Sequence, residues 1–160
     1  MVEVLLVHNK FRWSKPLTYL SYAIRVVTCS RWNHVAIRID ETVIEAKGNG
    51  VHTSAYSDWL AGSDRIVLPM RAKKLDLNAD EAVLATEGMH YGFMDLVERF
   101  RKIVITKWNG SDNYVLKDRT GIICSDLACI LLEIPQTYMP SELEFYSGLL
   151  RGKEFVTYSA

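Results

Sequence analysis

The chain has no excess of charge of either sign. Lys plus Arg and Asp plus Glu number 19 each, so the formal net charge is zero. Proteins that bind nucleic acid usually carry a basic surface that neutralises phosphates. The balanced composition therefore predicts no nucleic-acid partner.

Cysteines are few and lack the spacing of a framework. The three, Cys29, Cys124 and Cys129, are an odd number and form no C-x-x-C pair. This pattern argues against a disulfide scaffold and against a structural zinc site. At least one free thiol is expected, and we predict no metal and no cofactor.

Long apolar runs, repeats and low-complexity segments are also missing. The N-terminal MVEVLLVHNKFRW is too short in its apolar part for a signal peptide or a membrane span. The apolar stretch LTYLSYAIRVV, residues 17–27, is interrupted by Arg25. We therefore expect no membrane span and one domain over residues 1–160, while the compartment stays open, either cytoplasmic or reached by another route.

Hydrophobic periodicity predicts an α+β fold with a small antiparallel sheet or partial barrel packed against helices. A hairpin centred near Asp40 and Glu41 would place Glu45 opposite Val35, so a bulge would bring Glu45 onto the face of His34. The expected strands are 2–7, 33–40, 42–46, a strand near Val51, 65–70 and 155–158; the expected helices are 16–28, 57–60, a helix from Asn78, 94–105, 122–133 and a helix capped by Ser141 with Glu144.

One cysteine lies where an apolar run becomes a helical pattern, in TGIICSDLACILLE, residues 120–133. A helix N-terminus stabilises a thiolate, the nucleophilic form, by about 0.3–1 kcal/mol. This is less than one pKa unit, so Cys124 needs a nearby imidazolium as well. Cys129 fits a buried structural residue, and Cys124 taken alone fits one too.

His34 and Glu45 are the candidate partners of Cys124. His34 opens an alternating strand whose rigid backbone can direct its ring at a helix end. Glu45 lies between apolar residues of the next strand, where a carboxylate needs a partner. Taken singly, His34 fits a hydrogen-bonded strand histidine and Glu45 a salt-bridge partner.

Five short motifs in order resemble the circularly permuted, papain-like branch of the NlpC-type cysteine peptidase superfamily. They are WNHVAI, VIEAKGNGV, GMHY, ICSDL and MPSEL. YiiX-like hydrolases are the nearest group, and lecithin retinol acyltransferases are more distant. The resemblance implies a nucleophile at a helix N-terminus, with Cys124 as nucleophile, His34 as general base and Glu45 orienting His34. Tyr91 would line the substrate site or donate to the oxyanion, and taken alone it fits a core tyrosine with a hydrogen-bonded hydroxyl equally well.

The resemblance predicts a thiol hydrolase, a peptidase or amidase. Its substrate would be a peptide, amide or acyl compound, such as a peptidoglycan fragment. Val2–Glu3 and Gly92 depart from the Gly-Asp pair and the Asp of many relatives, which leaves the substrate open. Alternatives are an acyltransferase or lipid-active enzyme, a non-catalytic binding module, and, ranked last, a metal site of His34, His52, Cys124 and Glu45.

Overall fold

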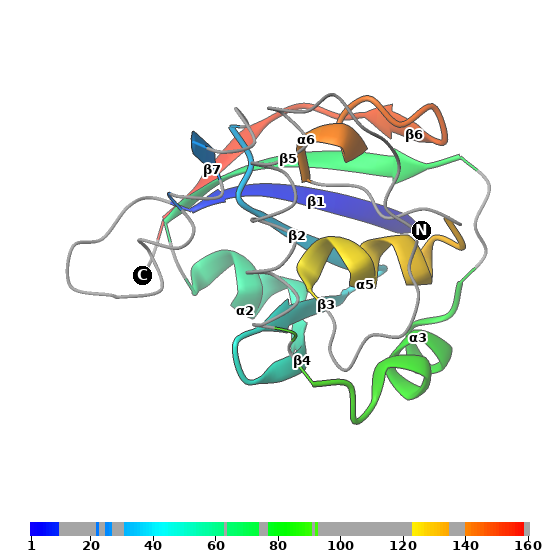
Figure 1. Cartoon of the computed structure of the whole chain (residues 1–160). Coiled ribbons are helices and arrows are strands. Elements are labelled where there is room, and N and C mark those ends of the chain that lie inside the picture. Colours follow the sequence, from blue (N-terminus) through cyan, green and yellow to red (C-terminus); the bar gives the residue numbers. More distant parts are fainter. Residues whose placement is uncertain are drawn as a thin grey trace, which may run out of the picture.

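The computed structural model describes residues 1–9, 22, 25–26, 31–62, 64–73, 77–90, 92, 123–134 and 140–158. This part of the chain has a mixed α+β fold, with a seven-stranded antiparallel sheet and a few helices (Figure 1). The predicted helix 94–105 lies outside the described residues. The predicted helix 16–28 is described only at Tyr22, Arg25 and Val26, all of them helical.

The strands confirm most of the sequence prediction. In sheet order β4-β3-β2-β1-β5-β6, the central strand β1 pairs with β2 and β5, and β7 also pairs with β5. The strand Leu149–Arg151 was not predicted, because its three residues show no clear alternation of apolar and polar side chains. It forms by pairing with β5. The bounds are β1 Val2–Asn9, β2 His34–Ile39, β3 Thr42–Lys47, β4 Gly50–Ala55, β5 Arg65–Ala72, β6 Leu149–Arg151 and β7 Phe155–Thr157.

The β2–β3 hairpin turns through two residues, and its register differs from the prediction. Ile39 lies opposite Thr42 and Ile37 opposite Ile44, with Asp40 in the turn at φ 52°. The predicted placing of Glu45 opposite Val35 is therefore wrong by one residue, because a two-residue turn directs Glu45 toward Ala36. In the next hairpin Gly50 has φ 124°, a conformation that favours glycine.

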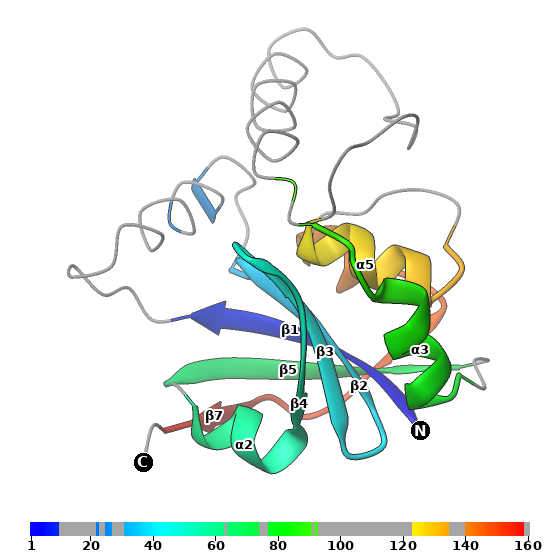
Figure 2. The same ribbon diagram turned by 90° about the horizontal axis from the view of Figure 1, so that it is seen from below.

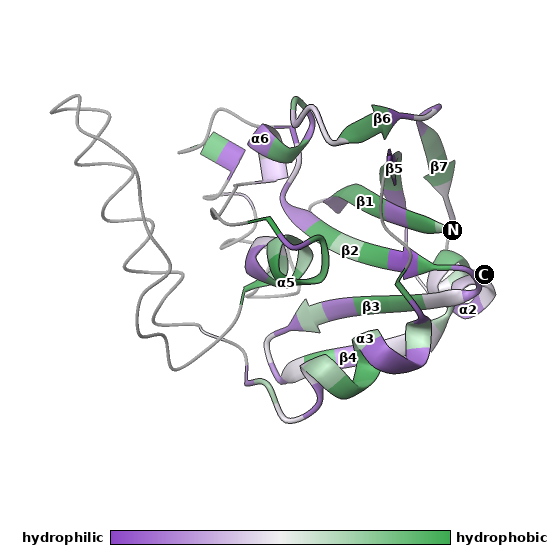
Figure 3. Ribbon diagram, turned by 90° about the vertical axis from the view of Figure 1, so that its right-hand side faces the viewer, coloured by the Kyte–Doolittle hydropathy of each residue, from purple (hydrophilic) through white to green (hydrophobic). Residues whose placement is uncertain are grey.

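The sheet buries both faces. Leu6, Val35 and Leu68 belong to the core cluster that packs against helix α5, Cys124–Leu131, on the side we call the α5 face. Leu5, Ala36 and Trp59 belong to the second cluster, on the α2 face, where Trp59 comes from helix α2, Tyr56–Ala61. Figure 2 shows these two helices on opposite sides of the sheet, and hydropathy colours much of β2 and β3 green in Figure 3.

Two helix predictions have different outcomes. Asn78 caps α3, Ala79–Thr86, as predicted, and its side chain accepts a hydrogen bond from the Asp80 amide. The capping box of Ser141 with Glu144 is wrong, because helix α6, Pro140–Leu143, already includes Ser141. Proline suits the first helical turn since its φ is fixed near the helical value.

Glu144 does not form the predicted capping box and instead links the end of α6 to Trp32 and to β6. Its carboxylate accepts a hydrogen bond from Trp32 Nε1 at 2.6 Å and from Arg151 at 2.6 Å.

In the part of the chain that the structure describes, no helix has both the length and the apolar character needed to cross a bilayer.

Candidate active site

Cys124 is the first residue of α5, which begins two residues later than predicted. The buried Ile123 precedes it in an extended conformation, and the first helical hydrogen bond runs from the Leu127 amide to the Ile123 carbonyl. Leu127 and Ala128 are fully buried and hold α5 against β2 and β3. The packing therefore fixes a half-buried thiol at the N-terminus of α5.

The strands β2 and β3 part where the helix meets them. Their paired register ends at Ile37 and Ile44, so Val35 lies beyond the ladder. The backbone amide of Val35 donates a hydrogen bond to the sulfur of Cys124. The opening between the two strands thus gives the helix end direct access to a backbone donor.

His34 contacts both other members of the predicted set. Its Nε2 lies 2.9 Å from Oε2 of Glu45, and its ring also hydrogen-bonds Cys124. Because Nε2 faces the carboxylate, Nδ1 is the nitrogen left for the sulfur. Continuing the observed register puts Glu45 beside Ala36, two residues from His34, so both side chains start on one face without a bulge.

Lys47 holds the other carboxylate oxygen. Its Nζ lies 2.6 Å from Oε1 of Glu45, and the two residues share a strand face because they are two apart on β3. The Glu45 side chain is only 3% exposed, whereas that of Lys47 is 52% exposed. Glu45 is therefore a buried carboxylate with a cation on each side.

Charge and hydrogen bonding overcome burial at all three groups. Burial alone would lower the pKa of His34, but hydrogen bonds and charges from Cys124 and Glu45 raise it to about 9. Burial likewise opposes ionisation of Glu45, yet His34 and then Lys47 lower its pKa to about 2. Burial raises the pKa of Cys124, but His34 and the Val35 amide lower it more strongly. These shifts favour a thiolate, an imidazolium and a carboxylate in contact.

Hydrogen bonds of Asn33 hold the beginning of β2, where His34 lies, against β1. The Oδ1 of Asn33 accepts a hydrogen bond from the Asn9 amide at 3.0 Å, and the Asn33 amide donates to the Val7 carbonyl at 3.0 Å. Asn33 is 6% exposed. Buried hydrogen bonds to the neighbouring strand therefore fix the backbone from which the His34 ring extends.

The start of α5 can also stabilise negative charge on a substrate. Amides of the first helical turn point out of the N-terminus, and the Cys124 amide is the one beside the thiol. Asp126 in the same turn opposes this, because its charge raises the pKa of Cys124. Tyr91, the predicted substrate-site residue, lies outside the described residues.

Other predicted residues have different surroundings. Cys129 is fully buried in the core, as expected. His52 lies opposite Glu45 across β3 and β4, but its Nε2 hydrogen-bonds Asn49 at 2.7 Å. Over the described ranges, no group of three His, Cys, Asp or Glu residues is placed to hold a metal ion, so the metal-site alternative gains no support.

Two contributors to the site, the Val35 amide and Lys47, were not predicted from the sequence. The Val35 amide has no side-chain signal, since any residue except proline would supply the same backbone N–H. Lys47 was detectable, because its spacing of two from Glu45 predicts a shared strand face.

Comparison with known proteins gives no match to any family model, curated protein or solved structure. Function must therefore be inferred from the geometry of the site together with the motif resemblance.

Proposed function

We propose that the protein is a thiol hydrolase, a peptidase or amidase that acts through Cys124, His34 and Glu45. The observation that carries this is the contact of His34 with both the thiol and the buried carboxylate. A histidine that lies between an acid and a thiol at a helix end is the arrangement that activates a sulfur nucleophile.

The chemistry follows from the protonation states that the site favours. The Cys124 thiolate attacks the carbonyl carbon of an amide, and the helix-start amide of Cys124 donates to the oxyanion. His34, protonated, gives its proton to the leaving amine as the carbon–nitrogen bond breaks, which leaves a thioester. Neutral His34 then takes a proton from water, hydroxide attacks the thioester, and the thiolate returns with release of a carboxylic acid.

Glu45 orients His34 in this scheme. Its carboxylate accepts from Nε2, which keeps Nδ1 facing the sulfur in both protonation states. Lys47 keeps Glu45 ionised and so preserves this orientation.

A permuted papain-like fold is the architecture that we propose. It is supported by the chain order, in which the histidine and glutamate strands precede the nucleophile helix, and by the packing of α5 on β2 and β3. Peptides of the cell wall are the substrate class that the motif resemblance suggests.

An acyl-enzyme assay tests the proposal. The native protein is incubated with p-nitrophenyl esters and with peptide amides, and intact mass is recorded at short times. We expect an acyl adduct on Cys124 that clears with release of acid, and no adduct in Cys124→Ala. Cys129→Ala is the matched control and should keep the adduct, because Cys129 is buried in the core.

Two results would select the alternatives. An adduct that persists in water but clears when an amine, alcohol or lysolipid is added would indicate an acyltransferase. The absence of any adduct or turnover on Cys124 would contradict the hydrolase and favour the binding module.

A further inference from the structure

Arg25, the residue that interrupts the apolar stretch 17–27, makes an unusual contact. Its guanidinium lies 3.3 Å from Nε2 of His8, and both groups are partly buried. A guanidinium can only donate, so Nε2 accepts and the His8 ring is neutral with its proton on Nδ1. Burial and then the charges of Arg25 and Arg31 lower the pKa of His8, which agrees with a neutral ring.

Arg25 lacks a carboxylate partner among the described residues, whereas Arg31, the other arginine that lowers the pKa of His8, has one. Arg31 forms two hydrogen bonds with the Glu154 carboxylate, at 2.8 and 2.7 Å. Among the described residues, Arg25 has no ion pair with a carboxylate, and its buried Nε has no hydrogen-bond partner. A half-buried guanidinium without an anion lacks the partner that such groups normally have.

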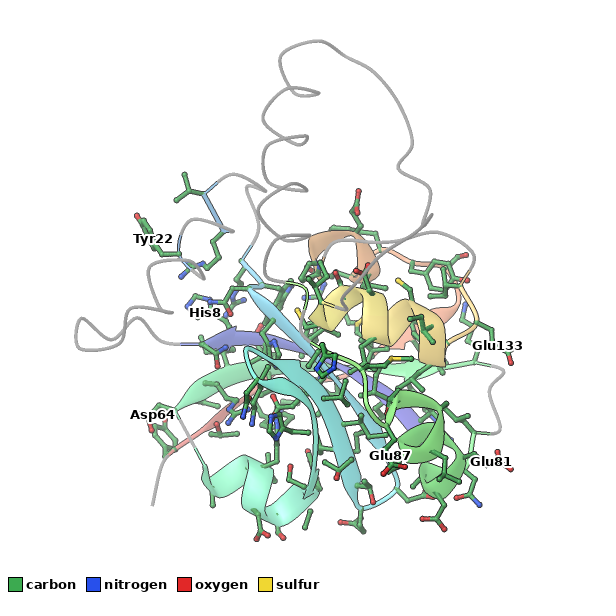
Figure 4. The ribbon with its side chains drawn as sticks, turned by 60° about the horizontal axis from the view of Figure 1, so that its bottom comes forward. His8, Tyr22, Asp64, Glu81, Glu87 and Glu133 are labelled. Carbon is green, nitrogen blue, oxygen red and sulfur yellow. The ribbon has the colours of Figure 1, made fainter. Side chains whose placement is uncertain are left out.

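The Arg25–His8 pair lies at the same end of the sheet as the thiol. On β1, Val7 is opposite His34 and Leu6 is opposite Val35, the residue whose amide reaches Cys124. Strand alternation puts His8 on the same face as Leu6, which is the α5 face. The same alternation starts His34 on the α2 face with Val7 and Ala36, so it is the thiol carried by α5 that shares a face with His8. Figure 4 shows His8 at the end of β1, and Figure 2 shows the described residues 22, 25 and 26 on the same side of the sheet as α5.

We propose that Arg25, positioned by His8, binds a carboxylate group of the substrate whose carbonyl Cys124 attacks. The inference rests on the proposed thiol hydrolase and adds its substrate class, an acyl compound or peptide with an acidic group near the scissile bond. Arginine suits this role because its planar donors match a carboxylate in a paired geometry. A substrate carboxylate would not have to compete with a carboxylate of the described residues for Arg25, since the partner of Arg25 there is a neutral ring.

Charged alkylating reagents test this without knowledge of the natural substrate. The full chain is treated with N-iodoacetylglycine, N-iodoacetyl-β-alanine and N-iodoacetyl-γ-aminobutyrate, and with the primary amide of each. The rate of Cys124 modification is followed by mass spectrometry, and the carboxylate-to-amide rate ratio is compared between variants. His34 favours anionic reagents in every variant, so the comparison isolates Arg25.

Four variants define the expected result. In Arg25→Gln the ratio should fall about fivefold for at least one spacer length, the effect of one charge-assisted contact at a half-exposed site. Arg25→Lys should keep part of the preference, and His8→Leu should reduce it by releasing Arg25. Arg71→Gln is the matched control and should leave the ratio unchanged, because Arg71 is exposed at the other end of β5.

Two outcomes would overturn the inference, and they differ in what they say of the hydrolase. Equal ratios in wild type and Arg25→Gln, with fast modification of Cys124 at acidic pH, would remove the carboxylate subsite and leave the hydrolase standing. Slow modification of Cys124 by every reagent in wild type would contradict the hydrolase and the inference together.

Discussion

Replacing Glu45 by glutamine removes the charge that stabilises the His34 imidazolium. The carboxylate is 3% exposed and accepts from Nε2 at 2.9 Å. A hydrogen bond to a charged group contributes about 1.5–3 kcal/mol, and about 1.4 kcal/mol is a factor of ten. Glutamine keeps a neutral acceptor, so we take the lower part of that range.

The effect should appear in the amount of thiolate at neutral pH. The thiol–imidazole and thiolate–imidazolium forms of Cys124 and His34 hold the same number of protons, so their ratio does not change with pH. Loss of the Glu45 charge moves this ratio toward the uncharged form. We expect Glu45→Gln to slow alkylation of Cys124 about tenfold near pH 6.5, the ordinary pKa of histidine.

Iodoacetamide labelling across a pH series, with Cys124 followed by mass spectrometry, measures this directly. Glu81→Gln serves as the matched control, since Glu81 is an exposed carboxylate on α3, away from the site (Figure 4). Circular dichroism would confirm that both variants fold. Superimposable pH profiles of Glu45→Gln and wild type would refute the electrostatic role of Glu45.

Three further predictions concern stability, measured by urea denaturation. The pKa of Glu45 is lowered from 4.5 in the unfolded chain to about 2 in the fold. The ionised carboxylate therefore stabilises the fold above pH 4.5, and this contribution is lost as the pH falls toward about 2. Wild type should thus lose about 2 kcal/mol more than Glu45→Gln over that interval, and equal losses would contradict the shift. Leu127→Ala, at a fully buried position of α5, should cost about 2–5 kcal/mol; a cost below about 1 kcal/mol would show that α5 is not held by this core. Asn78→Ala removes the cap of α3 and should cost about 1 kcal/mol, whereas no change would show that the cap contributes nothing.

Much of the sheet was predictable because its strands carry strong local patterns. The buried run of β1 and the alternation of β2 appear directly in the sequence. Contacts remote in sequence were not predictable: β6 has three residues and depends on β5 for its pairing. Local signals also misled at α6, where Ser141 resembles a cap although Pro140 already begins the helix.

The predicted triad residues come together because the fold joins distant segments. The sequence indicated a helix start at Cys124 and a hairpin that carries His34 and Glu45, but gave no distance between them. Their contact depends on the parting of β2 and β3 beyond Ile37, which no periodicity reveals. The register error had a simple origin, since a hairpin centred between Asp40 and Glu41 pairs Glu45 with Ala36 rather than Val35.

The central claim is that His34 holds Cys124 as a thiolate, and the pH dependence of iodoacetamide labelling tests it most directly. Wild type and His34→Ala are labelled between pH 5 and 9, and the modified cysteine is mapped by mass spectrometry. We predict rapid labelling of Cys124 well below its ordinary pKa near 9.0, because the His34 contacts lower that pKa, and much slower labelling in the variant. Labelling that rises only near pH 9 and is the same in both proteins would contradict the claim.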